Sequence, residues 1–209
     1  GGHASATGRP VAVGVDTGFW ARRAAKEHAK YVDVSWAASG AEADGAEADG
    51  AAPTYRAFPA ASTWAVPSDA AFVHVCANET IHGLELLEDP TLPPEAAHVP
   101  IAADFTSTLL SRPVDVSKYG VLYCSGGKNL GPAGVTLCLV KDSLLDAGRE
   151  HPACPSVLSY SQVGNSKPIG SIYSTPPTFQ VRPRAPPPPH TDPPLRSAPP
   201  PPPLPCPLL

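Results

Sequence analysis

The chain of 209 residues contains no methionine, so residue 1 is not a natural translation start. We therefore expect a fragment of a longer protein, with its N-terminus and any targeting peptide missing. The sequence also lacks any apolar run near the ~18 residues that span a bilayer, which argues against a membrane protein. We predict an intracellular location, either in the cytoplasm or in an organelle such as the plastid.

Basic runs and paired cysteines are also lacking. The net charge is −4 at pH 7, so we do not expect nucleic acid as a partner. The five cysteines are odd in number and have no C-x-x-C spacing, as is typical of a reduced, intracellular protein. Cys76, Cys124 and Cys138 stand in apolar runs, where cysteine acts as a small hydrophobe. His74 and Cys76 form one H-x-C pair without a second pair, so we expect core packing and no metal site.

Proline is abundant and unevenly placed. Of 29 prolines, sixteen lie in the last 34 residues, so residues 180–209 are predicted to be a disordered or polyproline II tail. A ligand for SH3 or WW domains and an out-of-frame extension are the two alternatives for this tail. Residues 37–52, which repeat AEADG, are predicted to be a disordered low-complexity insertion.

The remaining sequence alternates short apolar runs with helical or irregular segments, which predicts an α/β layer. A helix is expected over 19–30, with Asp16 or Thr17 as its cap, and a shorter one over 142–147. Strands are expected at 11–16, 31–36, 71–76, 99–103, 121–123 and 135–140.

A glycine-rich loop with one lysine joins the last two expected strands, in the sequence YGVLYCSGGKNLGPAG. Between two buried strands, the amine of Lys128 would be desolvated, which favours its neutral, nucleophilic form. Such an amine can form a Schiff base with a carbonyl compound, so Lys128 is our candidate catalytic residue. A phosphate-binding P-loop is excluded, since it needs glycine in place of Leu122 and Ser or Thr in place of Asn129. A solvated hairpin lysine fits the local pattern equally well.

Three other residues stand close to expected strand ends, where open α/β sheets bind ligands. Trp20 begins the first helix, and the local pattern alone favours a core tryptophan. Thr80 follows a strand, where its hydroxyl can either bind a ligand or form a turn. Asp104 ends an apolar strand, where a carboxylate is costly unless it has a positive partner, a helix cap or a loop hydrogen bond.

Five motifs occur in order along the chain: NETIHG, ADFTSTLLSRPVDVSKYG, YGVLYCSGGKNLGPAG, CPSVLSY and STPPTF. Together they resemble phosphoserine aminotransferase, a family of class V, fold-type I enzymes that use pyridoxal 5'-phosphate. The resemblance runs with interruptions from about Val11 to Phe179. It implies that residues 1–179 form part of the large domain of that α/β fold, with a mixed, mostly parallel sheet and flanking helices.

The resemblance also implies cofactor-binding roles. Lys128 would carry pyridoxal phosphate covalently, and Trp20, in the D-x-G-x-W segment, would lie flat against its pyridine ring. Thr80 would form a hydrogen bond near the phenolic oxygen of the ring. Asp104 would keep the pyridine nitrogen protonated, so that the ring draws electrons from the substrate.

Residues 171–179 resemble the family segment that reaches the cofactor of a neighbouring subunit. Ser174 and Thr175 would donate hydrogen bonds to its phosphate across the interface of a homodimer. Ser174 replaces the asparagine that is usual in the family, and Gly127 replaces a glutamine. Thr175 is therefore the better supported of the two phosphate contacts.

The activity implied is that of a phosphoserine transaminase in L-serine biosynthesis. It would transfer the amino group of L-glutamate to 3-phosphohydroxypyruvate and give O-phosphoserine. Two alternatives stay open: another class V enzyme such as a cysteine desulfurase, and a non-catalytic interaction protein that uses its polyproline tail. Whether the fragment is active by itself is also open.

Overall fold

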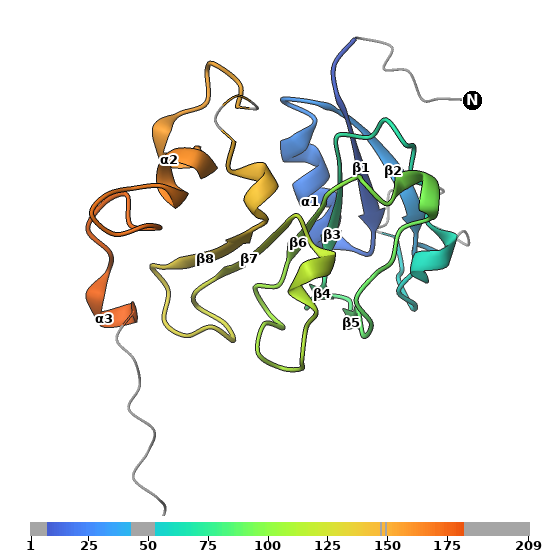
Figure 1. Cartoon of the computed structure of the whole chain (residues 1–209). Coiled ribbons are helices and arrows are strands. Elements are labelled where there is room, and N and C mark those ends of the chain that lie inside the picture. Colours follow the sequence, from blue (N-terminus) through green and yellow to red (C-terminus); the bar gives the residue numbers. More distant parts are fainter. Residues whose placement is uncertain (1–7, 43–52, 147, 149, 182–209) are drawn as a thin grey trace, which may run out of the picture.

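The structure is a computed structural model, and it describes residues 8–42, 53–146, 148 and 150–181. Its centre is a six-stranded sheet in the order β2-β1-β3-β6-β7-β8 (Figure 1). Neighbouring strands are parallel except for β7 and β8, which pair antiparallel at one edge. This arrangement confirms the mixed, mostly parallel sheet that the sequence predicts.

Each strand coincides with an apolar run of the sequence, although some bounds differ. The predicted strand at 31–36 is shifted, because β2 runs from Asp33 to Ser39. Residues 37–39 therefore belong to the sheet, which corrects the predicted start of the low-complexity insertion at 37. Residues 43–52 lie outside the described part. The other strands are β1 (Val11–Asp16), β3 (Phe72–Cys76), β6 (Ile101–Asp104), β7 (Val121–Ser125) and β8 (Thr136–Val140).

The helix α1 (Phe19–His28) follows β1 and buries Ala21 and Ala25, whose small side chains allow close packing on the sheet. It ends two residues before the predicted end. The predicted cap is wrong: Gly18 is the N-cap residue, and it has no side chain with which to bond the first turn. The side chain of Asp16 is instead occupied by donors from α1 and β2.

One face of the sheet carries the main hydrophobic core. Strand residues that are paired in register point to the same face, and here they include Val73, Ile101 and Leu122 with their neighbours two positions along. These side chains are at most 4% exposed. Loops and single-turn helices between residues 53 and 119, not long helices, cover this face with Trp64, Val66, Leu86, Leu92, Phe105 and Tyr119.

The opposite face is only partly covered. His28 of α1 packs edge-on against Phe72 and His74, with ring centroids 5.3 and 4.9 Å apart. Beyond α1 this face leaves a hollow of about 480 Å³, lined mainly by apolar side chains that include Val121 and Tyr160. Of the predicted flanking helices, α1 lies on this face, and it is the one helix of more than five residues in the described ranges.

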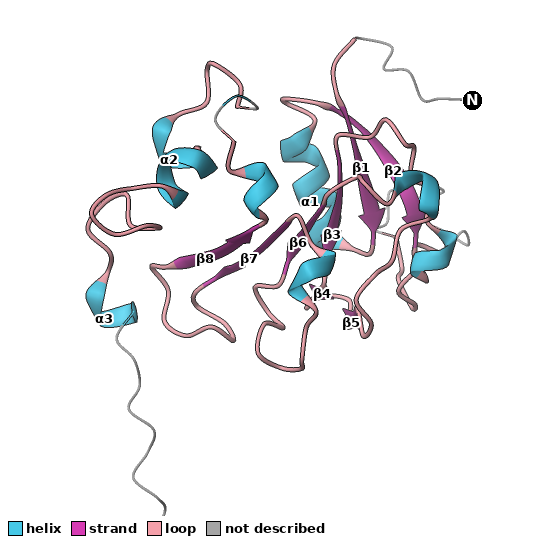
Figure 2. Cartoon of the chain, in the orientation of Figure 1, coloured by secondary structure: helices cyan, strands magenta, loops and turns pink. Residues whose placement is uncertain are grey.

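Much of the remaining described chain is irregular (Figure 2). A two-stranded hairpin, β4 (Asn78–Glu79) with β5 (Leu84–Glu85), lies within the NETIHG region. The helix predicted at 142–147 is a single 3-10 turn, Asp142–Leu144. Two short helices follow, α2 (Tyr160–Gly164) and α3 (Thr178–Val181). The first two residues of the predicted tail thus belong to α3, and 182–209 lie outside the described residues.

Two expectations from composition are tested by burial and helix length. Cys76 and Cys124 are free and buried as predicted, whereas Cys138 lies on β8, whose first four residues are exposed. None of the described helices has the length and apolar content needed to cross a bilayer.

Candidate active site

The lysine loop is a tight, hydrogen-bonded turn between β7 and β8. Gly126 N donates to Val135 O at 2.7 Å, and Gly131 N donates to Lys128 O at 3.1 Å. A side chain at Gly126 would place its Cβ 2.3 Å from Pro132 O, so the two arms of the loop approach too closely for any other residue. Gly127 has φ 103°, a left-handed conformation that favours glycine. The glycines therefore fix the loop that presents Lys128.

Lys128 is exposed, which corrects the expectation that two buried strands would desolvate it. The first four residues of β8, the strand that follows the loop, are exposed as well, so this strand does not bury the lysine. The Lys128 Nζ atom lies 5.3 Å from the centroid of the Trp20 ring. An exposed cation–π contact of this kind stabilises by only ~0.5–1 kcal/mol, so a ligand could displace the amine from the ring.

Trp20 lies in the first turn of α1 and is only partly buried, so the local pattern was misleading in favouring a core tryptophan. Its indole Nε1 donates to Thr80 Oγ1 at 3.2 Å. Thr80 thus contacts Trp20 directly, which the sequence did not predict. A threonine hydroxyl has one proton and two lone pairs, so Thr80 can accept from Trp20 and still donate to a ligand.

Asp104 ends β6 and is half-buried. Its Oδ1 accepts a hydrogen bond from Thr106 N at 2.8 Å, which is the loop contact that the sequence left as an alternative. No ion pair involving Asp104 occurs in the described residues. The carboxylate therefore keeps free lone pairs for a positive partner from outside this part of the chain.

The electrostatic surroundings of the Cys76 thiol show that Glu79, Asp104 and Lys128 lie near one another. Burial raises its pKa, the carboxylates of Glu79 and Asp104 raise it further, and the amine of Lys128 lowers it. Cys76 is paired in register with Asp104, which is paired in turn with Tyr123. Asp104 and Lys128 therefore act on the same thiol at the carboxyl ends of the strands, the lower rim of the sheet in Figure 1.

Ser174 and Thr175 are not brought to this cluster. Both are exposed, in the irregular stretch before α3. Among the described residues, no hydrogen bond or ring contact joins either of them to Lys128, Trp20 or Asp104. Their role toward a neighbouring subunit stays a prediction.

One buried residue of the site was missed by the sequence analysis. Glu79 is 0% exposed, and its carboxylate accepts hydrogen bonds from the amides of Trp20 and Ala21. A usable signal existed, because Gly18 leaves the start of α1 without a cap, and an acidic residue directly precedes Thr80.

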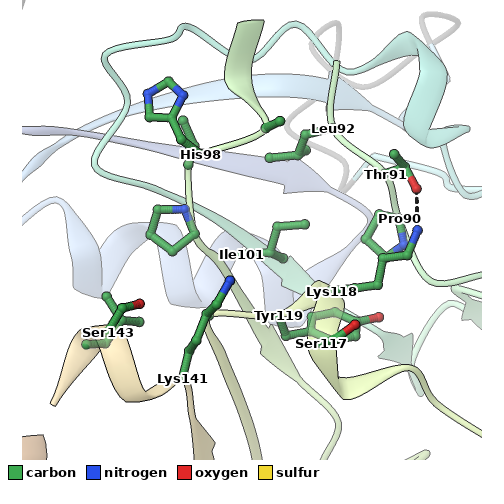
Figure 3. A pocket seen from close by; sticks show the side chains of 15 residues that line it. Pro90, Thr91, Leu92, His98, Ile101, Ser117, Lys118, Tyr119, Lys141 and Ser143 are labelled. Carbon is green, nitrogen blue, oxygen red and sulfur yellow. Dashed lines mark hydrogen bonds between the residues drawn. The ribbon is translucent and has the colours of Figure 1, made fainter. Parts of the chain in front are cut away.

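A separate pocket of about 290 Å³ lies at the opposite rim of the sheet (Figure 3). It is lined by Pro100 and Ile101 at the start of β6, and by Lys118 and Lys141. Lys118 Nζ donates to Thr91 Oγ1 at 2.5 Å. None of the predicted site residues lines this pocket, so it does not belong to the cluster around Lys128. The described residues also contain no group of three or more side chains able to hold a metal.

The model of the family described as "Aminotransferase class-V" matches residues 39–165, more than half of the chain. The chain belongs to the class-V aminotransferase family. The match contains Thr80, Asp104 and Lys128, which the geometry above places at one rim of the sheet.

The chain is similar to curated phosphoserine aminotransferases. It is 41% identical over 173 residues to that of Paraburkholderia phytofirmans, covering 83% of this chain and 43% of the relative. With that of Polaromonas it is 41% identical over 167 residues, covering 80% and 41%. The chain thus spans about two fifths of the length of the curated relatives that it matches.

Solved structures show the same similarity. Phosphoserine aminotransferase from Bacillus circulans subsp. alkalophilus matches with a TM-score of 0.68 and 31% identity, covering 82% of this chain and 42% of that one. The pyridoxal-phosphate-bound enzyme from Trichomonas vaginalis matches with a TM-score of 0.63 and 30% identity, covering 83% and 44%. These matches confirm that the sheet is a partial fold-type I aminotransferase fold.

Proposed function

We propose that this class-V aminotransferase is part of a phosphoserine transaminase that uses pyridoxal phosphate. The full-length enzyme would transfer the amino group of L-glutamate to 3-phosphohydroxypyruvate, giving O-phosphoserine for L-serine biosynthesis. The observation that carries the proposal is the amine of Lys128 at 5.3 Å from the ring of Trp20, at the same rim as Asp104. The identity of 41% to phosphoserine aminotransferases supports the substrate pair.

The described residues fit the cofactor. An aromatic face, a primary amine and a half-buried carboxylate with free lone pairs stand together, and they match a flat ring that carries an aldehyde and a basic nitrogen. Lys128 would hold the cofactor covalently, Trp20 would stack on it and Thr80 would donate to it. When bound, pyridoxal phosphate supplies an electron sink for the substrate.

Proton transfer would be the task of Lys128. After the amino substrate has displaced it, the free Nζ would take the proton from the α-carbon of L-glutamate as a general base. The carboxylate of Asp104 would hold a proton on the ring nitrogen by charge and hydrogen bonding. Covalent attachment and proton transfer both use the neutral form of the Lys128 amine, and we propose that a segment from outside the described residues covers this exposed lysine.

A homodimer would supply part of that cover. Residues between 137 and 181 expose many large apolar side chains, which a subunit interface would bury. Ser174 and Thr175, exposed on the same part of the chain, would donate to the phosphate at the partner's site. The exposed set is Leu137, Leu139, Val157, Leu158, Tyr160, Ile169, Ile172, Tyr173, Phe179 and Val181. Sedimentation of a full-length version as a monomer would remove this part of the proposal.

Trapping the lysine tests the cofactor proposal directly. The chain is mixed with pyridoxal phosphate and reduced with borohydride, and the labelled peptide is identified by mass spectrometry. We expect the label on Lys128 and its loss in Lys128→Ala. Lys118→Ala, which changes an exposed lysine of another loop, is the matched control and should keep the label. A label on any other lysine would contradict the assignment.

The substrates need a full-length version of the enzyme. A panel of amino donors and acceptors should show preference for L-glutamate with 3-phosphohydroxypyruvate. Preference for another pair, or desulfuration of cysteine, would exclude a phosphoserine transaminase while leaving the cofactor site intact. We also propose an intracellular location, in the cytoplasm or a plastid, on the evidence of the free buried thiols of Cys76 and Cys124.

A further inference from the structure

The start of α1 has no cap of its own. The first amides of a helix lack partners within the helix, and a side chain at the N-cap position usually accepts from them. Here the N-cap residue is Gly18, with φ 147°, and no side-chain hydrogen bond is made from that position. The partner of these amides must therefore come from elsewhere in the chain.

Glu79 provides it from β4, 58 and 59 residues further along the sequence. Its Oε1 accepts from Ala21 N at 2.7 Å, and its Oε2 accepts from Trp20 N at 3.0 Å. The side chain is fully buried, and none of the salt bridges of the described residues involves it. A buried carboxylate without a cation is costly, so its position needs a reason beyond filling space.

The close approach of Glu79 requires the glycine. A Cβ at Gly18 would lie 2.4 Å from His82 Cδ2 and 3.0 Å from Glu79 Cδ. A local Ser, Thr, Asp or Asn cap at this position would displace the Glu79 carboxylate. The sequence thus excludes the local cap and uses a distant one.

The segment that carries Glu79 also forms a second hydrogen bond with Trp20, at its indole ring. Thr80, the next residue after Glu79, accepts from the Trp20 indole Nε1 at 3.2 Å. The pair Glu79–Thr80 therefore binds Trp20 at its main-chain nitrogen and at the far side of its ring. Two fixed points restrict both the backbone position and the side-chain rotation of the tryptophan.

We propose that Glu79 is a positioning residue, which sets the orientation of the Trp20 ring toward Lys128. Its carboxylate acts through Trp20 and touches no reacting atom. The inference concerns the shape of the site, and it rests on the proposed function only for the identity of the flat ring that stacks on Trp20.

The first experiment needs no cofactor. In ¹⁵N-labelled protein, the Trp20 indole signal is assigned by its loss in Trp20→Phe. In Glu79→Gln one carboxylate oxygen becomes an NH₂ donor, which cannot accept from a backbone amide. We expect a shifted Trp20 indole signal, and at least tenfold faster hydrogen exchange at one or both of the Trp20 and Ala21 amides, since only one acceptor oxygen remains. Thr80→Val should shift the indole signal and leave these two amides protected.

Glu85→Gln is the matched control. Glu85 stands on β5 of the same hairpin, and it accepts a hydrogen bond from Thr108 Oγ1, away from Trp20. This variant should leave the Trp20 signals unchanged. An unshifted Trp20 indole in Glu79→Gln, or an equal shift in Glu85→Gln, overturns the proposal. If Glu79→Gln does not fold, hydrogen exchange in the wild-type protein tests the proposal. Unprotected amides at Trp20 and Ala21 would then exclude their hydrogen bonds to Glu79.

A titration with pyridoxal phosphate then joins the geometry to binding. We expect the visible band of the bound cofactor to need at least tenfold more pyridoxal phosphate in Glu79→Gln than in wild type, and no more in Glu85→Gln. Equal titration of all three proteins would contradict the positioning role. A full-length version that binds no pyridoxal phosphate would count against the proposed function, and the exchange data would still decide the role of Glu79.

Discussion

Arg22 and Asp16 form a bidentate salt bridge: the Arg22 Nε atom donates to Asp16 Oδ1 at 3.0 Å, and Nη2 donates to Oδ2 at 2.9 Å. Such paired, charge-assisted bonds are stronger and more directional than a single one. Asp16 ends β1 and Arg22 lies at the end of the first turn of α1, so the pair links the strand to the helix. Tyr55 and Ser39 also donate to the carboxylate, at 2.7 and 2.8 Å, which explains how Asp16 can be buried.

We predict that Asp16→Asn lowers the free energy of unfolding by about 2 kcal/mol, because an amide cannot accept from all of these donors. A larger loss is not expected, since Arg22 is 47% exposed at its side chain and regains water. The midpoint of urea unfolding measures the change. Glu42→Gln breaks an exposed pair with Arg56 and should leave the midpoint where it is. Equal shifts in both variants would contradict the difference in burial.

The second prediction concerns acid stability and His74. Burial and, to a smaller extent, the charge of the neighbouring His28 together lower the pKa of His74 to about 3. In the unfolded chain a histidine titrates near ~6.5, so between these values only the unfolded state binds the proton. The contribution of the neutral His74 side chain to the free energy of unfolding is therefore fully present above pH ~6.5. It falls by ~1.4 kcal/mol per pH unit as the pH drops toward 3.

Two histidine variants separate the contribution of His74 to the pH dependence of stability. His74→Gln keeps a polar group for the hydroxyl of Tyr123, which bonds His74 Nε2 at 2.9 Å, but it cannot titrate. Its unfolding free energy should depend less steeply on pH between 4 and 6 than that of wild type. The exposed His98, changed to Gln, serves as control and should keep the wild-type slope. Identical slopes for wild type and His74→Gln would refute the prediction.

The third prediction concerns the lysine loop. Gly126→Ala forces a Cβ against the main-chain oxygen of Pro132, which cannot rotate away as a side chain could. We expect a loss of ~1–3 kcal/mol in unfolding free energy, typical of overpacking, and weaker trapping of pyridoxal phosphate at Lys128. In Gly148→Ala the nearest atom is the Asp146 carboxylate at 3.3 Å, and this variant should show neither effect. An unchanged Gly126→Ala protein would mean that the loop is looser than its hydrogen bonds indicate.

The fourth prediction separates fold from chemistry at Asp104. Asp104→Asn retains an oxygen that can accept from Thr106 N, so the melting temperature should stay within a few degrees of wild type. Without the negative charge the ring nitrogen of the cofactor loses its partner, and turnover by a full-length version should fall by about 10²-fold or more. Restored turnover in Asp104→Glu would support the charge as the cause. Full activity in Asp104→Asn would remove Asp104 from the site.

The sequence predicts the strands of this fold well, because apolar runs report where backbone is buried, and β1, β3, β6 and β7 lie within a few residues of their predicted bounds. Exposure is a different property. Lys128 and Cys138 were expected inside because their neighbours are apolar, but burial depends on what packs over a strand, and the first four residues of β8 are exposed.

The site shows the same limit. Trp20, Thr80, Asp104 and Lys128 were each predicted separately, and the structure places them at one rim of the sheet. The contact between Trp20 and Thr80 joins residues 60 apart in sequence, so no local pattern could reveal it. Glu79 had a signal in the uncapped glycine at the start of α1, but that signal does not say which distant acidic residue accepts from the free amides.

The strand β8 has a practical consequence for any work with this chain. Among the described residues it hydrogen-bonds only to β7, so its outer side presents free amide and carbonyl groups beside Leu137 and Leu139, 38% and 40% exposed. Such an edge is a template on which further copies can add, strand upon strand. The isolated chain should therefore tend to precipitate as its concentration rises, and a lysine introduced on the exposed edge of β8 should raise its solubility.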